Sequence, residues 1–154
     1  MNNPSSPFSE PSTVAPELAR VVAHWQGLRR GQNSIPFWDD LDLGALSFAA
    51  ERLLVLDVFE KPERYRFAVV GREISDRYGA EIPGRFADEI APRDPLEYLR
   101  AQCSATIECG QPTYYRHIAA AKAGQHALPG YTRLLLPMWG EGHIAVLLGA
   151  LAWG

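Results

Sequence analysis

The sequence is poor in the residues that cross-link small proteins. Its 154 residues include only two cysteines, Cys103 and Cys109, six positions apart. We expect both in one helix, where this spacing puts them on different faces, and there is no third cysteine to complete a zinc site. At this length roughly two thirds of the unfolded chain's surface is buried on folding, so one core is stable without a disulfide or a metal. The chain is therefore predicted to form a single folded domain.

The chain also lacks an excess of positive charge and a long apolar run. A net charge of −3 leaves no basic face for phosphate groups, which excludes nucleic acid as a direct partner. No stretch reaches about eighteen uninterrupted apolar residues, and the N-terminus has neither the basic start nor the apolar run of a secretory signal. We therefore expect no membrane insertion and a cytoplasmic location.

Signatures of catalysis and metal binding are missing as well. The four histidines are scattered, and no two have the helical spacing of a metal-binding pair: His24, His117, His126 and His143. The sequence has no nucleophile elbow and no glycine-rich phosphate loop. These patterns predict no catalytic residue and no metal site, they leave any cofactor unknown, and they favour a protein that is not an enzyme.

The N-terminal part divides into a tail and a helix. Residues 1–15 are rich in proline, serine and asparagine and are predicted to be disordered. A leading amphipathic helix is predicted over 16–31, because apolar residues recur there at helical spacing: Leu18, Val21, Val22 and Trp25. This apolar face needs a cover. It is predicted to pack on a sheet or to pair with a second copy of the chain, which makes these four residues candidates for a dimer interface.

The core is predicted over 53–154 and contains five strand-like segments. Their apolar runs, separated by turn residues, lie at 53–59, 65–70, 113–119, 131–139 and 143–153. Helices are expected at 43–52, 73–78 and 96–109. Short strands are stable only when several pair, so the five segments are expected to form one antiparallel sheet with helices on one face, an α+β fold. We call the space between sheet and helices the cup.

Three charged residues interrupt these apolar strands, where an unpaired charge would be costly: Asp57, Arg66 and Arg133. In one interpretation Asp57 and Arg66 form a structural ion pair across a two-residue hairpin, and Arg133 lies at an edge or on the helix-covered rim. In the other, one arginine faces the cup and binds an anionic ligand such as a carboxylate through its planar fork. Arg85, which follows Gly84, is a second candidate for that role.

Several aromatic residues fall where they either line the cup or fill it as core. With the two arginines they make up the candidate ligand-binding set: Tyr65, Phe67, Tyr78, Arg85, Phe86, Tyr98 and Arg133. Which of these side chains point inward depends on strand register, because a slip of one residue reverses the face.

An ordered series of residues carries a resemblance to a known family. It runs through Trp25, Arg29, the connector 36–40, residues 53–57, the segment 65–71, Gly79, Gly84-Arg85, Pro112 and residues 131–137. In this order they resemble the PAS domains, and in particular the bacterial PAS-like proteins in which a tryptophan-bearing helix precedes the domain. The match covers most of residues 20–150. It implies a five-stranded antiparallel sheet with helices gathered on one face.

The resemblance implies a non-enzymatic sensory or protein-interaction module. PAS domains bind haem, flavin, small metabolites or nothing, so either a small organic ligand or side chains fill the cup. The expected partners are a second copy, forming a homodimer, and a separate signalling protein that receives the signal through contact. Flavin photochemistry would need a reactive cysteine in an asparagine-rich loop, whereas Cys103 belongs to the apolar stripe of a predicted helix.

Two other classes of function stay open at this point. A small cup-shaped α+β enzyme could act on a hydrophobic metabolite with Asp57 as its base, which predicts a deep pocket around that residue. A purely structural, dimerising protein would have a sealed core and no ligand.

Overall fold

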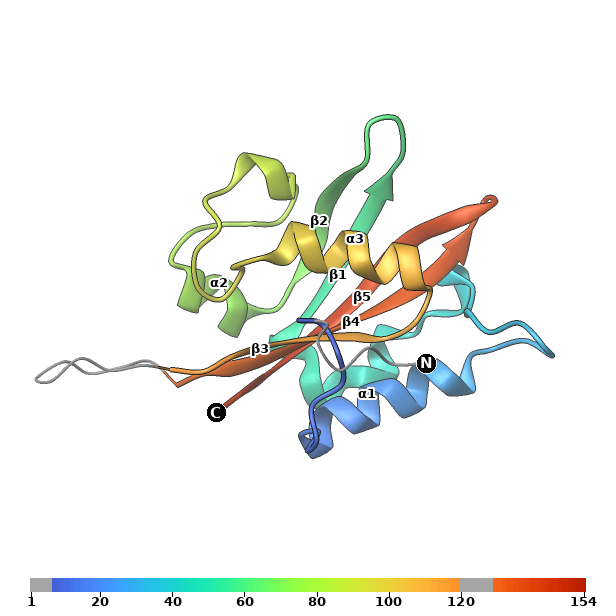
Figure 1. The fold of residues 1–154 in the computed structure, drawn as a ribbon, viewed down its shortest axis with the longest axis horizontal. Helices are drawn as coiled ribbons and strands as arrows, with labels where there is room; N and C mark the ends of the chain where they lie inside the picture. The colour runs from blue at the N-terminus through green and yellow to red at the C-terminus, as the bar shows by residue number, and fades with distance from the viewer. Residues whose placement is uncertain (1–6, 120–128) are drawn as a thin grey trace, which may run out of the picture.

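A five-stranded sheet organises the chain in the computed structural model, which describes residues 7–119 and 129–154 (Figure 1). In chain order the elements are α1 (Pro16–Gly27), η1 (Trp38–Asp40), η2 (Leu43–Arg52), β1 (Leu53–Phe59), β2 (Arg64–Val70), α2 (Arg72–Tyr78), η3 (Ala87–Glu89), α3 (Leu99–Cys109), β3 (Thr113–His117), β4 (Tyr131–Gly140) and β5 (His143–Trp153). Of the four histidines, His126 lies outside the described residues.

The strands follow the order β2-β1-β5-β4-β3, and every pair is antiparallel. The first and last strands in the chain are therefore neighbours at the centre of the sheet. Runs of leucine, valine and alanine in β1, β4 and β5 suit this central place, because both faces of these strands are covered. The predicted α+β fold with one antiparallel sheet is confirmed.

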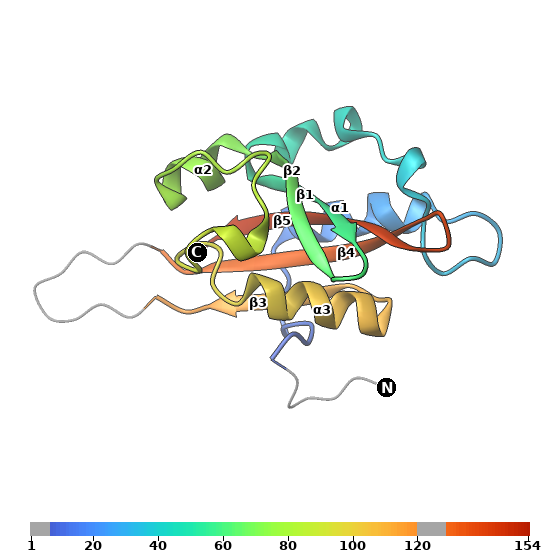
Figure 2. The ribbon, with the colours of Figure 1, turned by 90° about the horizontal axis from the view of Figure 1, so that it is seen from above.

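Alternation along the strands separates two apolar cores. On the inner face, side chains such as Leu56, Phe67 and Leu147 pack with α2, η3 and α3. On the outer face, Val55, Leu136 and others pack under α1 and η2. Figures 1 and 2 show α1 and α3 on opposite sides of the sheet. The cup thus lies on the inner face, and the outer face is closed by the N-terminal part of the same chain.

Trp25 fixes α1 to the outer face. Its indole Nε1 donates a buried hydrogen bond of 2.8 Å to the carbonyl oxygen of Pro137 in β4. Leu18, Val21 and Trp25 are all buried by the chain's own sheet, and Val22 is half-buried. A dimer made through these residues stays a prediction, and it would require α1 to leave the sheet.

Pro137 explains why the indole finds a free acceptor in the middle of β4. Residues of an antiparallel strand direct their N–H and C=O to the same side. The pairing of β3 with β4 ends at Leu135, so beyond it this side of β4 has no β3 neighbour. A proline at this position breaks no hydrogen bond between strands, because β3 does not extend far enough to accept one. The carbonyl of Pro137 is likewise left available to Trp25.

The helix ends differ from the sequence-based expectation. The leading helix ends at Gly27 rather than at residue 31, and the helix expected from residue 96 begins only at Leu99. Asp94 does not cap it, because its carboxylate is paired with Arg77, and Tyr98 at the N-cap has a φ of 58°. Long-range contacts of the segment 93–98 therefore replace the first turn that the local pattern predicts. Likewise β3 ends at His117, not at residue 119.

Part of the predicted tail makes contacts with the sheet. The backbone N–H of Tyr114 in β3 donates to the carbonyl of Phe8 at 3.0 Å, and Val14 and Ala15 pack against the outer core. Contacts with the domain therefore begin before Pro16, while residues 1–6 lie outside the described part of the chain. No helix in the described ranges is both long and apolar enough to cross a membrane.

Candidate functional site

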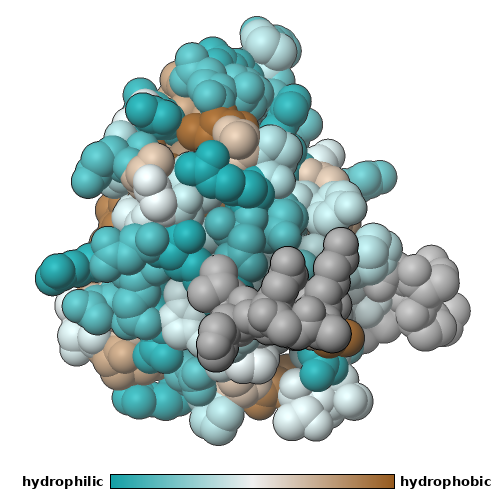
Figure 3. All heavy atoms as spheres, turned by 90° about the vertical axis from the view of Figure 1, so that its left-hand side faces the viewer, coloured by the Kyte–Doolittle hydropathy of each residue, from teal (hydrophilic) through white to brown (hydrophobic). Residues whose placement is uncertain are grey.

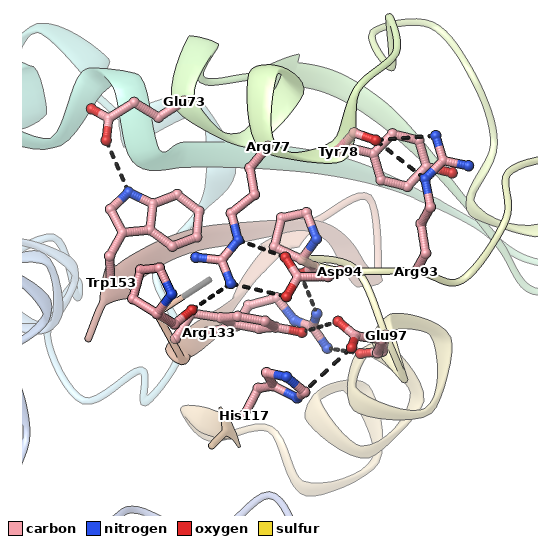
Figure 4. Close-up of polar contacts among 12 residues, drawn as sticks. Glu73, Arg77, Tyr78, Arg93, Asp94, Glu97, His117, Arg133 and Trp153 are labelled. Atoms are coloured by element: carbon pink, nitrogen blue, oxygen red, sulfur yellow. Dashed lines mark hydrogen bonds and ion pairs between the residues drawn. The ribbon is translucent and has the colours of Figure 1, made fainter. Parts of the chain in front are cut away.

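A network of polar side chains joins the helical side of the cup to the sheet where α2, the segment 93–98, β3 and β4 meet (Figure 4). We call it the polar network, and its members are Arg77, Asp94, Glu97, Gln102, His117, Tyr131 and Arg133. Arg77 of α2 forms a two-pronged ion pair with Asp94: Nε lies 2.6 Å from Oδ1 and Nη2 lies 2.9 Å from Oδ2. The same guanidinium donates to the carbonyl of Pro129 and lies 4.7 Å from the ring centre of Trp153. Arg77 thereby links α2 to the residues that flank β4 and to the end of β5.

Glu97 is the second acidic member of the polar network. One of its carboxylate oxygens accepts a hydrogen bond from the Tyr131 hydroxyl, and the other lies 3.7 Å from Nδ1 of His117. The rings of His117 and Tyr131 are stacked, with centres 5.2 Å apart. Burial, and then the bond to Glu97, raises the pKa of Tyr131, so its hydroxyl remains a donor.

Arg133 is a fully buried arginine of the polar network and points from β4 into the cup. Its Nε donates to Oε1 of Gln102 at 2.8 Å, Nη1 donates to the Pro95 carbonyl at 3.0 Å and Nη2 donates to the Glu97 carbonyl at 2.7 Å. Burial lowers the pKa of Arg133, because desolvation disfavours the charged form. The guanidinium is held mainly by neutral oxygen atoms of the chain itself.

The carboxylates of Asp94 and Glu97 and the imidazole of His117 come close enough to suggest a metal site, with ligand atoms within 4.8 Å of one another. Their existing contacts do not fit one. Arg77 occupies both oxygens of Asp94, and Tyr131 occupies one oxygen of Glu97. A divalent cation would also face the two guanidinium groups of the polar network. We interpret the three residues as members of a charge-balanced cluster that holds the fold together.

The surface around this end of the molecule is mainly hydrophilic. Figure 3 views the described residues from the side on which α2 lies in Figure 1, and apolar side chains are scattered there. Arg93 fits this picture, because its guanidinium donates two hydrogen bonds to the carbonyl of Tyr78 and lies over that tyrosine's ring. The polar network therefore lies beneath a mainly hydrophilic surface.

The candidate ligand-binding residues do not gather in one place. Tyr65, Phe67 and Tyr78 are buried in the inner core, and Arg133 faces the cup with its donors bonded to the chain. Arg85 and Tyr98 are exposed, Tyr98 by 66%, so neither reaches the interior. Phe86 is half-buried and packs against Phe59 with ring centres 5.5 Å apart. A role for this set in binding a ligand stays a prediction.

The predicted register of the hairpin places Asp57 opposite Arg66, and the structure shows this pair with Oδ2 and Nη2 3.0 Å apart. Asp57 alternates with the inner-face residues Leu56 and Val58, so it lies on the outer face. The enzyme alternative with Asp57 as base therefore loses its support, because the carboxylate lies on the opposite side of the sheet from the cup.

Sequence reasoning missed five members of the polar network: Arg77, Asp94, Glu97, Gln102 and His117. The sequence did contain a signal for Gln102, because this polar residue lies beside the apolar stripe of α3. In the structure it is fully buried. Its amide nitrogen donates to Thr113 Oγ1 and to the Arg133 carbonyl. A polar side chain at a buried helical position requires such partners, so Gln102 and Thr106 together could have indicated polar contacts between α3 and the sheet.

A hollow of about 420 Å³ remains at the other end of the cup, where the β1–β2 and β4–β5 hairpins turn. Its floor is apolar, and its rim carries charged side chains from the β1–β2 hairpin. The lining residues are Val58, Glu60, Lys61, Glu63, Ile107, Trp139, His143 and Ile144. Its volume lies within the range typical of sites for small organic molecules.

The two cysteines are expected to differ sharply in reactivity. Cys103 is fully buried in the inner core, and burial raises the pKa of its thiol to about 12, whereas Cys109 is exposed. Because the thiolate is the reactive form, a disulfide reagent at pH 8 should titrate one thiol rapidly and the second only in denaturant. In Cys109→Ser protein the rapid phase should disappear. Rapid labelling of that folded variant would show that the inner core opens readily.

Comparison with models of known protein families finds no match, and comparison with curated protein sequences finds none either. Among solved structures, a light-oxygen-voltage (LOV) domain studied with a flavin analogue is similar, with a TM-score of 0.50 and 14% identity over 73% of this chain and 83% of that one. A fungal LOV domain photoreceptor has a TM-score of 0.46 and 18% identity, covering 89% of this chain and 88% of that one. An RNA-binding LOV receptor has a TM-score of 0.46 and 21% identity, covering 82% of this chain and 36% of that one.

The likeness to the first of these shows the fold. LOV domains are a subfamily of the PAS domains, so the chain has a PAS-like fold. Cys103 does not fit a role in flavin photochemistry. Cys103 belongs to the packed inner core around Phe67, Leu135 and Leu147, and its raised thiol pKa opposes the reactive state that such chemistry needs.

Proposed function

We propose that this protein is a non-enzymatic sensory or protein-interaction module that binds a small organic molecule in the cup. The observation that carries the proposal is that one face of the sheet is covered completely and the other is not. The chain's own α1 seals the outer face, while the inner face keeps a hollow of about 420 Å³ under the end of α3. A fold with one sealed and one hollow face suits binding, and the PAS-like fold supports a sensory role by analogy.

The mechanism would be a shift between two packings of the helices on the sheet. The polar network ties α2 and the segment 93–98 to β3 and β4, so a displacement of the helices must rearrange its bonds. A ligand that fits one packing better moves the population toward it, and only its difference in affinity for the two states sets the size of the effect. A partner protein would then respond to the altered surface.

Native mass spectrometry and an absorption spectrum of gently purified protein test this function, followed by a screen of metabolites for a rise in Tm. We expect a molecule that co-purifies or stabilises the protein and is recovered unchanged. Chemical conversion of that molecule would contradict a non-enzymatic role. A chain that neither retains nor binds any small molecule would support the structural, sealed-core alternative.

A further inference from the structure

We propose that the hollow between the two hairpins binds an organic cation with an apolar body, such as an aryl or alkyl ammonium compound. The inference rests on the proposed function, because it names the class of ligand for the hollow of about 420 Å³ in the cup. Four features of the hollow lead to this class: an apolar floor, an accessible indole, a rim with more carboxylates than ammonium groups, and the C-terminal end of a helix.

Two strands and one helix build the apolar floor. Val58 comes from the inner face of β1, Ile107 from the last turn of α3 and Ile144 from the start of β5. A bulge between Met138 and Trp139 in the β4–β5 register leaves Ala145 as the extra residue. It reverses the alternation, so that Ile144 rather than Ala145 joins the inner face beside Trp139. The bulge therefore completes the floor.

Trp139 supplies an aromatic wall. It is 36% exposed, and it also lines a second hollow of about 320 Å³ with Asn33, Ile35 and Phe37. Its backbone N–H donates to the carbonyl of Pro36 at 2.7 Å, which holds the end of β4 in place. An accessible tryptophan ring on a fixed backbone is the aromatic surface that binds cations best, because the negative face of the ring attracts them.

The charges at the rim favour a cation over an anion. Glu60 and Glu63 face the hollow against the single ammonium group of Lys61, and within the described residues none of the three belongs to an ion pair. The hydroxyl of Tyr65 contacts Glu63 from inside the cup. The last turn of α3, which contributes Ile107, carries no basic residue, so the negative end of the helix dipole adds to the same field.

Three molecules of similar size and different charge test the class: benzyltrimethylammonium, benzyl alcohol and phenylacetate. Isothermal titration calorimetry on the full chain should show the strongest binding for the ammonium compound and the weakest for phenylacetate. The ammonium affinity should also fall as salt is raised, because the rim carboxylates are exposed. Phenylacetate binding as tightly as the ammonium compound would overturn the proposal.

Variants locate the site. Glu60→Gln with Glu63→Gln should weaken ammonium binding about fivefold to tenfold, and Trp139→Leu, which keeps an apolar wall, should weaken it about fivefold. Lys61→Gln should strengthen it, because a like charge is removed. Glu141→Gln at the tip of the β4–β5 turn does not line the hollow and is the matched control, with less than about a twofold effect.

The outcomes separate this inference from the proposed function. Circular dichroism of each variant verifies that an effect on binding is not a loss of fold. Equal binding by all variants would place the ammonium compound elsewhere and overturn the inference. If the metabolite screen finds a neutral or anionic ligand, the sensory role stands and the cationic class fails. If an ammonium compound binds here and is chemically converted, the site stands and the non-enzymatic role fails.

Discussion

Trp25→Ala is expected to lower the free energy of unfolding by about 4 kcal/mol, the largest loss we predict for a single substitution in this chain. The side chain is only 3% exposed, and its removal leaves a large cavity between α1 and the outer face of the sheet. The Pro137 carbonyl also loses its donor. Unfolding in urea, followed by circular dichroism, measures the change.

Trp25→Phe separates packing from hydrogen bonding and serves where the alanine variant does not fold. It retains most of the apolar area but lacks the N–H, so a loss of about 2 kcal/mol is expected. Gln26→Ala lies on the exposed side of the same helix and should change stability by less than about 0.5 kcal/mol. A Trp25→Ala protein as stable as the wild type would contradict the packing of α1 on its own sheet.

Protein concentration distinguishes this packing from a dimer interface. If Trp25 stabilises the chain that contains it, the urea midpoints of wild type and variant do not depend on concentration. If Trp25 is instead buried against a second copy of the chain, the free energy of unfolding rises with protein concentration. Light scattering then shows a lower mass for the Trp25→Ala variant than for the wild type. The measurement therefore also tests the predicted homodimer through Leu18, Val21, Val22 and Trp25.

The strands could be read from the sequence because their signals are local. Turn residues follow the apolar run of β1 and precede that of β5, and both strands were predicted with the limits that the structure shows. The start of α3 could not be read in this way. Asp94 looks like a helix cap in the local pattern, yet it pairs with Arg77, which is 17 positions away. Only the folded arrangement brings this competing partner close.

The candidate site was predictable in part for a similar reason. A charged residue in an apolar strand signals a required partner, which singled out Arg133 and left open whether it faces the rim or the cup. The structure places it in the cup, but its partners include the backbone carbonyls of Pro95 and Glu97. Every residue has a carbonyl, so no residue type marks these acceptors, and the path of the chain through 93–98 decides them.

Arg133→Met is expected to lower the free energy of unfolding by about 3 kcal/mol. Methionine has a similar length and no donor, so the carbonyls of Pro95 and Glu97 and the amide oxygen of Gln102 all lose the hydrogen bonds that the guanidinium makes. The cost of burying a charge is also removed, which keeps the loss below the sum of the three bonds. Urea unfolding at pH 7 measures the effect.

The control for this substitution is Arg116→Met, an exposed arginine on the neighbouring strand β3, which should alter stability by less than about 0.5 kcal/mol. Gln102→Leu with Arg133→Met completes a double-mutant cycle. Because the two side chains bond each other, the double variant should lose at least about 1 kcal/mol less than the sum of the single losses. Additive losses would show that the guanidinium does not depend on Gln102.

The same variant decides between the two roles that the strand position of Arg133 allows. If its donors serve the chain, as the three bonds indicate, Arg133→Met weakens the protein whether or not any ligand is present. If its main role were to bind an anion in the cup, the empty protein would keep its stability and only the stabilisation by that anion would vanish. An unchanged urea midpoint without ligand would therefore overturn the structural role and restore Arg133 as a ligand-binding residue.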